Sequence, residues 1–187
     1  MNHGADSDPG RFSFESDSPG ATIAAAEALG RLLAGGDAVA LLGELGSGKT
    51  VFVRGLAAGL GCRPEEVHSP SFTLVNEYRC GRSRLRLAHV DLYRIASAEE
   101  LPGIGWDEYL RPGYVLAVEW PERAERWLPA DHVRVSLESR GGDSRQVAGE
   151  ATGPRAGALL RAWREALGGG EGRRAAGVDP RTPIRDR

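Results

Sequence analysis

Apolar positions recur at helical spacing in three segments of the chain. In the first of them, Ile23, Ala26, Leu29 and Leu33 share one side of a helix that would end before a pair of glycines. The second segment stops at a glycine with a proline beyond it, and the third places four large apolar residues on one side. The pattern therefore predicts helices over residues 22–34, 49–60 and 154–167.

Two short apolar runs lie among these helices, over residues 38–42 and 114–119. Neither run alternates with polar residues, which is typical of parallel strands that are buried on both faces. Strands that alternate with helices along a chain indicate an α/β fold. We therefore predict an α/β sandwich of three layers with a mostly parallel central sheet.

Further strand-like runs predict two hairpins, which would make the sheet mixed. Residues 72–78 and 84–91 are separated by a short connection that contains glycine. Residues 132–138 alternate between apolar and polar positions, as a half-exposed strand does. Residues 145–150 can pair with them across a Gly-Gly turn.

The two ends of the chain differ in composition from the segment between them. Residues 1–17 are polar and acidic and have no apolar core, which excludes a signal peptide and predicts a flexible leader. Residues 168–187 are rich in Gly, Arg and Pro and predict a disordered tail that is either solvated or in contact with RNA. Residues 18–167 would then form one domain, as expected for a chain of 187 residues.

Composition excludes several classes of protein. Hydrophobic residues make up 41% and charged residues 27%, which are ordinary values for a soluble globular protein. The net charge of −2 does not indicate a strongly basic nucleic-acid groove, although it leaves a local basic patch open. No apolar stretch approaches the ~20 residues that cross a bilayer. Cys62 and Cys80 lack metal-binding or redox spacing, so we expect two free thiols in a reducing cytoplasm.

The strongest chemical signal is the segment GELGSGKT at residues 43–50. It matches the phosphate-loop pattern G-x-x-x-x-G-K-[ST] and lies between a predicted strand and a predicted helix, which indicates the P-loop NTPase type of α/β sandwich. Glycines let backbone N–H groups turn toward phosphate oxygens, and the helix directs its positive end to the same place. Lys49 would reach the β- and γ-phosphates, and the Thr50 hydroxyl would bind Mg²⁺.

Lysine usage supports this interpretation. Of 24 basic residues, Lys49 is the single lysine. A compact ammonium fits a phosphate cradle in which a planar guanidinium would not. The lone lysine also excludes the N-K-x-D motif with which GTPases bind guanine, so an adenine nucleotide is favoured.

A phosphate loop requires an acidic partner for Mg²⁺ at the end of a neighbouring strand. Asp91 and Glu119 each end a strand-like run. The run before Glu119 is more apolar and fits the strand beside the phosphate loop better. We therefore predict that Glu119 is the acid on the metal side and that Asp91 is a second acid that orients water or the metal. A purely structural hydrogen bond is the alternative for either residue, and which of them contacts the metal stays open.

Other polar and aromatic residues between these motifs have two possible interpretations. The hydroxyls in Ser69-Pro70-Ser71-Phe72-Thr73 form either a switch-like segment that senses the γ-phosphate or a plain turn. Trp120 either stacks near a nucleotide or anchors the core. His89 is expected to be a hydrogen-bonded structural residue. A small-molecule kinase and a nucleotide-sensing binding module remain alternatives to an ATPase.

Four motifs taken together resemble the TsaE family, which are small bacterial P-loop ATPases of tRNA threonylcarbamoyladenosine synthesis. The motifs are GELGSGKT at 43–50, SPSFTLV at 69–75, HVDLYR at 89–94 and VEWPE at 118–122. Their order and spacing agree over about residues 18–140. Many families share the phosphate loop, whereas the four motifs together are specific.

This resemblance implies a cytoplasmic protein that binds ATP with Mg²⁺, works with TsaD and TsaB, and has no membrane association. That complex places a threonylcarbamoyl group on an adenosine of ANN-decoding tRNAs. A TsaE protein hydrolyses ATP weakly alone, does not transfer the group itself, and meets tRNA only through the complex.

The resemblance also implies roles for single residues. Lys49, Asp91 and Glu119 would act in catalysis, and Thr50 and Glu119 would hold Mg²⁺. The switch-like segment would contain Ser71 and Thr73. The residues implied in nucleotide binding are Ser18, Gly43, Gly46, Ser47, Gly48, Lys49, Thr50 and Val51. No arginine finger is evident among the motifs, so a partner would complete or order the site.

Overall fold

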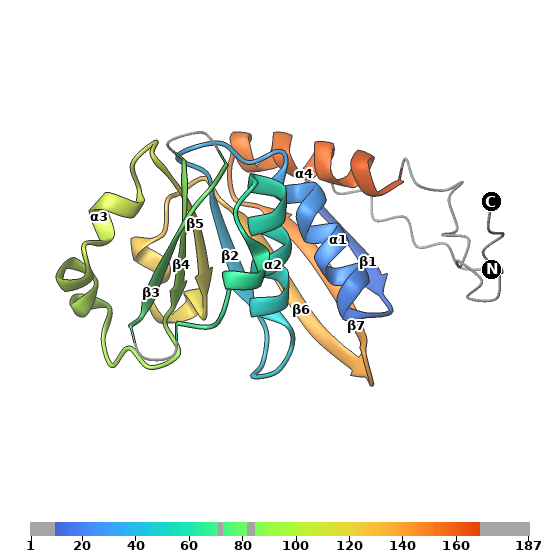
Figure 1. Ribbon diagram of the computed structural model, residues 1–187, viewed down its shortest axis with the longest axis horizontal. Coiled ribbons are helices and arrows are strands. Elements are labelled where there is room, and N and C mark those ends of the chain that lie inside the picture. Colours follow the sequence, from blue (N-terminus) through green and yellow to red (C-terminus); the bar gives the residue numbers. More distant parts are fainter. Residues whose placement is uncertain (1–9, 71–72, 82–84, 169–187) are drawn as a thin grey trace, which may run out of the picture.

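One seven-stranded sheet runs through the protein (Figure 1). The computed structural model describes residues 10–70, 73–81 and 85–168. The strands lie in the order β1-β7-β6-β2-β5-β4-β3. They are β1 (Arg11–Ser16), β2 (Ala38–Leu42), β3 (Val75–Arg79), β4 (Arg86–Asp91), β5 (Tyr114–Glu119), β6 (Val133–Gly141) and β7 (Ser144–Ala151).

The centre of the sheet is parallel and its flanks are antiparallel. Strand β2 pairs in parallel with β6 on one side and β5 on the other, and β5 pairs in parallel with β4. Strands β3 and β7 run antiparallel to their neighbours. The prediction of a mixed, mostly parallel sheet is confirmed, as are both predicted hairpins. The strand that ends in Glu119 does lie beside the strand that leads into the phosphate loop.

Three long helices cover one face of the sheet. They are α1 (Pro19–Gly30), α2 (Lys49–Leu60) and α4 (Pro154–Gly168). The first begins three residues earlier than the apolar pattern indicates, because Ser18 caps it: the Ser18 Oγ accepts from the Ala21 N–H at 3.2 Å. Pro19 at the first helical position suits this start. No described helix combines the length and the apolar character that a membrane crossing requires.

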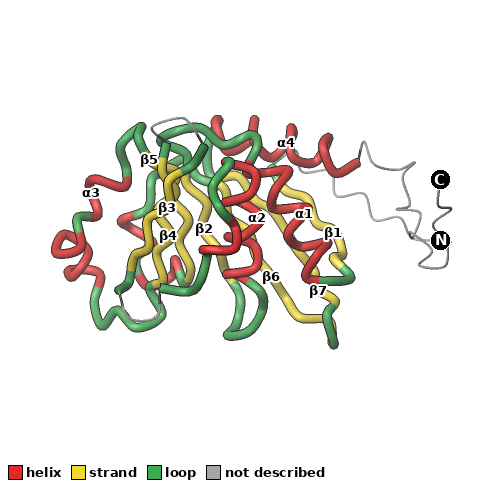
Figure 2. Tube along the Cα trace, viewed as in Figure 1, coloured by secondary structure: helices red, strands yellow, loops and turns green. Residues whose placement is uncertain are grey.

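The two faces of the sheet are covered differently (Figure 2). On the helical face, fully buried Leu29, Phe52 and Trp163 join α1, α2 and α4 in one apolar cluster. On the other face, a second cluster lies over β4 and β5 and includes Leu101 and Trp106, from short helical segments between β4 and β5. These segments are η2 (Ala98–Ile104) and α3 (Trp106–Tyr109). The second outer layer is thus built of short turns rather than long helices.

Helices α1 and α2 pack closely because glycines line their contact. A side-chain carbon added at Gly59 would lie 2.3 Å from the Glu27 carbonyl oxygen, and one added at Gly55 would lie 2.4 Å from the Ile23 carbonyl oxygen. Neither contact is sterically possible. The close contact fixes α2, and with it the phosphate loop at its start.

The predicted flexible leader is wrong for residues 11–16. These residues form β1, which pairs antiparallel with β7 along its whole length. Phe12 lies in the core with its ring centroid 5.0 Å from that of Trp163. Phe12 and Phe14 alternate with polar residues, which is a strand pattern. The pattern was missed because the other residues of this segment are mostly polar or acidic. Residues 1–9 and the predicted tail beyond Gly168 lie outside the described residues.

The two cysteines form a disulfide, so the prediction of free thiols is wrong. Cys62 follows the end of α2, and Cys80 follows β3. A backbone hydrogen bond from Gly81 N–H to the Gly61 carbonyl, at 2.7 Å, holds the two segments together. The cysteines are 18 residues apart in the sequence, and this spacing alone does not indicate that they meet.

Candidate functional site

The phosphate loop connects β2 to α2 at the carboxyl edge of the parallel strands. Gly43 and Gly48 have φ values of 141° and 104°, a conformation that side chains rarely adopt. A side-chain carbon on Gly43 would also lie 2.4 Å from the Leu137 carbonyl oxygen. Gly48 immediately precedes Lys49, the first residue of α2, so the loop's amides and the helix's positive end face the same place. The strand–loop–helix context predicted for GELGSGKT is confirmed.

Lys49 lies inside this loop and is only 4% exposed. Its Nζ donates to the carbonyl oxygens of Gly43, at 2.7 Å, and Glu44, at 2.9 Å. The ammonium also lies 4.0 Å from the centre of the Trp120 ring. Burial lowers the pKa of Lys49, while the nearby carboxylates of Glu119 and Asp91 oppose that shift. Carbonyls and a π face around a buried ammonium make a cationic centre at the start of α2.

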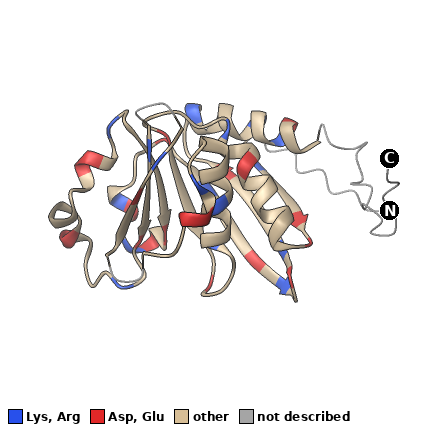
Figure 3. Ribbon diagram, in the orientation of Figure 1, with Lys and Arg blue, Asp and Glu red and all other residues tan. Residues whose placement is uncertain are grey.

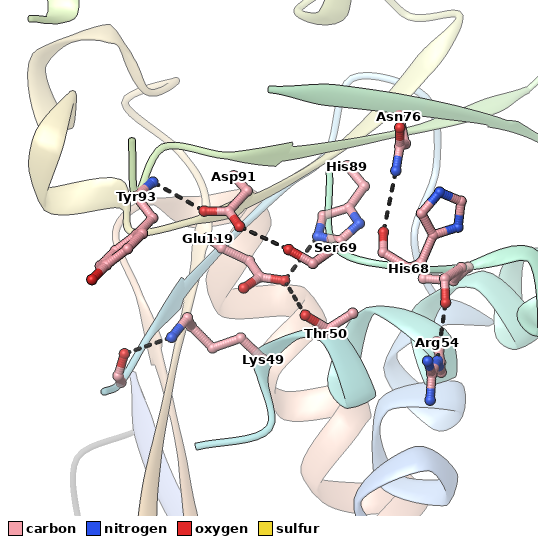
Figure 4. A network of polar contacts seen from close by, with 12 residues as sticks. Lys49, Thr50, Arg54, His68, Ser69, Asn76, His89, Asp91, Tyr93 and Glu119 are labelled. Carbon is pink, nitrogen blue, oxygen red and sulfur yellow. Dashed lines mark hydrogen bonds and ion pairs between the residues drawn. The ribbon is translucent and has the colours of Figure 1, made fainter. Parts of the chain in front are cut away.

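A second group of contacts joins α2 to the ends of β4 and β5 (Figure 4). The Thr50 hydroxyl donates to Glu119 Oε1 at 2.8 Å. His89 Nε2 approaches the same Glu119 oxygen, also at 2.8 Å. Glu119 is almost completely buried and lies opposite Asp91 in the β4–β5 register. Two of the predicted catalytic residues therefore end neighbouring strands, and Thr50 bonds only to Glu119 of the two acids.

Asp91 contacts the segment that was predicted to act as a switch. The Ser69 hydroxyl donates to Asp91 Oδ2 at 2.9 Å, and the Tyr93 N–H donates to Oδ1 at 3.0 Å. Thr73 is exposed, and its hydroxyl donates to the Asn76 side chain at 3.2 Å. Ser71 lies outside the described residues. Within the described part of this segment, Ser69 rather than Thr73 bonds to a predicted catalytic acid.

A pocket of about 450 Å³ lies over these groups. Its wall combines the phosphate loop and the start of α2 with residues at the ends of β4 and β5. The predicted site residues that line it are Gly46, Gly48, Lys49, Thr50, Val51, Asp91 and Glu119. Gly43 and Ser47 line an adjoining hollow on the other side of the loop. The Ser47 hydroxyl is buried and has no partner among the described residues.

Ser18 lies at the same edge of the sheet, because β1 runs in the direction of β2 and Ser18 follows its end. Its hydroxyl caps α1, and Ser18 is not among the described residues that line the pocket or the adjoining hollow. The structure therefore places Ser18 at the correct edge without joining it to the other predicted site residues.

Arg145 is a pocket residue that the sequence analysis missed. It lies in β7, and its Nε donates to the Ser47 carbonyl at 2.9 Å while Nη1 donates to the Asp143 carbonyl at 2.6 Å. A side-chain carbon on Gly48 would lie 2.8 Å from the Arg145 Nε, so the glycine makes room for this guanidinium. Within the described part of the chain, Arg145 forms no ion pair with a carboxylate. Almost a hundred residues separate Arg145 from the loop, and no motif includes it.

Charge elsewhere is interspersed. In the view of Figure 3, acidic and basic residues are distributed over both helices and strands. At the phosphate loop, three cationic side chains and two acidic ones line the pocket: Lys49, Arg94, Arg145, Asp91 and Glu119.

Comparisons with known proteins agree with this geometry. The family model "Threonylcarbamoyl adenosine biosynthesis protein TsaE" matches residues 16–147, a range that contains the phosphate loop, both acids and Arg145. The tRNA threonylcarbamoyladenosine biosynthesis protein TsaE of Treponema pallidum is 44% identical over 119 residues, which cover 64% of this chain and 85% of the relative. The protein of the same name from Bacillus subtilis is 39% identical over 120 residues, covering 64% and 73%.

A solved structure shares the fold. The crystal structure of Bacillus subtilis YdiB superposes with a TM-score of 0.67 at 30% sequence identity, and the match covers 83% of this chain and 95% of that one. The matched family model spans well over half of the 187 residues. On these grounds, the chain belongs to the TsaE family.

Proposed function

We propose that this protein is a Mg²⁺-dependent ATPase that supports tRNA threonylcarbamoyladenosine biosynthesis together with TsaD and TsaB. It hydrolyses ATP weakly alone, leaves the transfer of the threonylcarbamoyl group to its partners, and meets tRNA through them. Membership of the TsaE family supports a role in tRNA threonylcarbamoyladenosine biosynthesis. The observation that carries the ATPase assignment is that one pocket joins Lys49, the Thr50–Glu119 pair and Asp91 at the phosphate loop.

The residues present fit a nucleoside triphosphate. Loop amides and the start of α2 favour anionic oxygens, and Lys49 supplies a compact cation at the same place. The Lys49 ammonium is held only by carbonyl oxygens and a π face among the contacts described above, and phosphate oxygens would be stronger partners. The unpartnered Ser47 hydroxyl on the loop agrees with a site whose ligand completes its hydrogen bonding.

The residues also fit Mg²⁺ bound together with a nucleotide. Thr50 and Glu119 offer oxygen atoms, which Mg²⁺ prefers. Among the described residues no group of three or more His, Cys, Asp or Glu side chains is placed to hold a metal. Mg²⁺ does not need such a cage, since it usually takes one or two protein ligands, substrate phosphates and water. When bound, the ion would neutralise charge that develops on the phosphates.

Asp91 is the residue that we assign to the attacking water. Its carboxylate is fixed by Ser69 and by the Tyr93 N–H, and it lines the pocket beside Glu119. A partner would complete the site from outside. Leu45 in the loop is 77% exposed and Tyr93 is 42% exposed, and both line the pocket as large apolar surfaces that a partner can cover.

The test is the rate of ATP hydrolysis by the purified protein, alone and with TsaD and TsaB. We expect slow hydrolysis alone and a clear increase with both partners. Lys49→Ala should lower the stimulated rate by roughly 10³-fold, because the cation at the phosphates is lost. Its circular-dichroism spectrum should not change. Arg31→Ala, which removes an exposed cation that does not line the pocket, is the matched control and should retain the rate.

Two outcomes would contradict the proposal. One is full hydrolysis by the Lys49→Ala variant, which would place the chemistry elsewhere. The other is an unstimulated rate in a preparation shown to bind ATP, which would favour a small-molecule kinase and call for a search for phosphate acceptors.

A further inference from the structure

His89 is a buried histidine that the proposed chemistry does not use directly. It lies on β4 opposite Ala117 of β5 and is 0% exposed. Its Nε2 lies 2.8 Å from Glu119 Oε1. Its Nδ1 is also buried and has no hydrogen-bond partner among the described residues. The Glu119 carboxylate is thus the polar contact that the structure gives to this ring.

Stability alone does not account for a histidine at this position. Strands β4 and β5 are otherwise buried and largely apolar here, and an apolar side chain would leave no ring nitrogen unpaired. A buried polar atom without a partner lowers the free energy of unfolding. The contact to Glu119 is the feature that an apolar residue would not reproduce.

We propose that His89 is a positioning residue that sets the orientation of the Glu119 carboxylate for Mg²⁺; this inference rests on the proposed function. Because a carboxylate oxygen accepts, Nε2 carries the hydrogen and donates. Glu119 Oε1 then receives two donors, the Thr50 hydroxyl at 2.8 Å and the His89 ring at 2.8 Å. Figure 4 shows both contacts on one oxygen, with the other oxygen on the side of Lys49.

The histidine contact is the one that does not depend on the metal site itself. Thr50 is both a donor to Glu119 and the proposed hydroxyl ligand, so its hydroxyl must adjust when a metal arrives. His89 is fixed within β4, so its hydrogen bond would keep Oε1 in place while the Thr50 hydroxyl turns toward a metal. Oε2 would then be free to bind Mg²⁺, and the affinity for Mg²⁺ would not be reduced by the cost of fixing the carboxylate in one rotamer.

The test compares ATP affinity with Mg²⁺ and with a chelator, measured at equilibrium without hydrolysis. The variants are His89→Gln, whose amide nitrogen reaches about as far as Nε2, and His89→Asn, whose amide is too short. We expect Mg²⁺ to strengthen ATP binding in the unchanged protein. In His89→Asn, the increase in ATP affinity that Mg²⁺ produces should be about ten-fold smaller, while the affinity without Mg²⁺ should not change. His89→Gln should retain most of that increase.

A double variant sharpens the result. If His89 acts through Glu119, adding His89→Asn to Glu119→Ala should change the Mg²⁺ dependence no further. Thermal unfolding of each variant confirms that it is folded. If His89→Asn fails to fold, His89→Leu, which also removes the donor and suits the apolar surroundings, is measured in its place.

The outcomes separate the two proposals. Absence of any Mg²⁺-dependent ATP binding in the unchanged protein would overturn the proposed function. If the unchanged protein shows Mg²⁺-dependent binding, two results would overturn the role of His89 but not the proposed function. One is an equal effect of His89→Asn and His89→Gln, and the other is a loss of Mg²⁺-free affinity in His89→Asn as large as its loss of affinity with Mg²⁺.

Discussion

The two edges of the sheet use polar groups in opposite ways. At the amino edge, Arg155 bonds to both carboxylate oxygens of Asp37, at 2.9 and 2.7 Å. Asp131 caps α4 by accepting from two backbone N–H groups at 2.8 Å, and the Cys62–Cys80 disulfide links α2 to β3. At the carboxyl edge, Lys49 is bonded to carbonyl oxygens, and Trp120 has a φ of 59°.

The difference separates groups that stabilise the fold from groups that we propose contact or position a ligand. At the amino edge, Asp37 and Asp131 both have hydrogen-bond partners within the chain, although the Nε2 of His132 is buried there without a described partner. The carboxyl edge keeps two buried polar atoms without described partners, on Ser47 and His89, together with a strained backbone at Trp120. Strain and unsatisfied groups persist where the surrounding structure holds them, and they concentrate at functional sites. Changes at the amino edge should therefore alter stability, and changes at the carboxyl edge should alter ligand affinity.

Removal of the disulfide should have the largest effect on stability at the amino edge. The bond closes a loop over a sequence separation of 18 residues, so its loss should lower the free energy of unfolding by about 3 kcal/mol. Urea unfolding of the oxidised protein, compared with the Cys62→Ser/Cys80→Ser variant, measures this change. Affinity for ATP should stay within a factor of two. Equal stability of both forms, or a large loss of affinity, would break the comparison.

Asp37→Asn should have the next largest effect. Asp37 is 9% exposed and accepts from the Arg155 guanidinium and from the Ala34 N–H. The variant removes the charge and leaves Arg155, which is 48% exposed, to solvent. We expect a loss of about 2 kcal/mol in the free energy of unfolding, with an unchanged rate of ATP hydrolysis per folded molecule. A matched surface variant, Glu138→Gln, removes an exposed ion pair and should cost less than 1 kcal/mol.

Local sequence patterns were sufficient for most of this architecture. The strands at residues 38–42 and 114–119 and the helix at 49–60 have the bounds that their apolar spacing predicts. The phosphate loop and the acids at strand ends follow from the same local rules. These elements depend on neighbours in sequence, and a parallel sheet brings the carboxyl ends of its strands to one edge.

Features that depend on distant partners were not predictable in this way. The alternation of Phe12 and Phe14 indicates a strand but not its pairing with β7, the disulfide depends on the meeting of two turns, and the His89–Glu119 contact depends on the register of β4 and β5. Nothing in the local spacing of these residues specifies the partner. The same holds for Arg145, which reaches Ser47 across a sequence separation of 98.

Arg145→Gln tests the carboxyl edge with the smallest expected effect. The guanidinium lies across Gly48 at the positive end of α2, beside Lys49, and forms no ion pair with a described carboxylate. An anion bound in the pocket would be attracted both by the positive end of α2 and by this guanidinium. We expect the Kd for ATP and for ADP to rise about ten-fold, or about 1.4 kcal/mol, with little loss of stability.

Arg145→Lys separates charge from geometry. Arg145 is fixed through Nε and Nη1 to two carbonyl oxygens, a fork that an ammonium cannot reproduce. If the fork positions the charge, the lysine variant should weaken nucleotide binding nearly as much as glutamine does. Full affinity in the lysine variant would mean that only the charge matters. The glutamine variant could instead keep its full affinity and lose about 2 kcal/mol or more of stability. That result would mean that Arg145 stabilises the fold, as Arg155 does at the amino edge, and it would break the comparison between the edges.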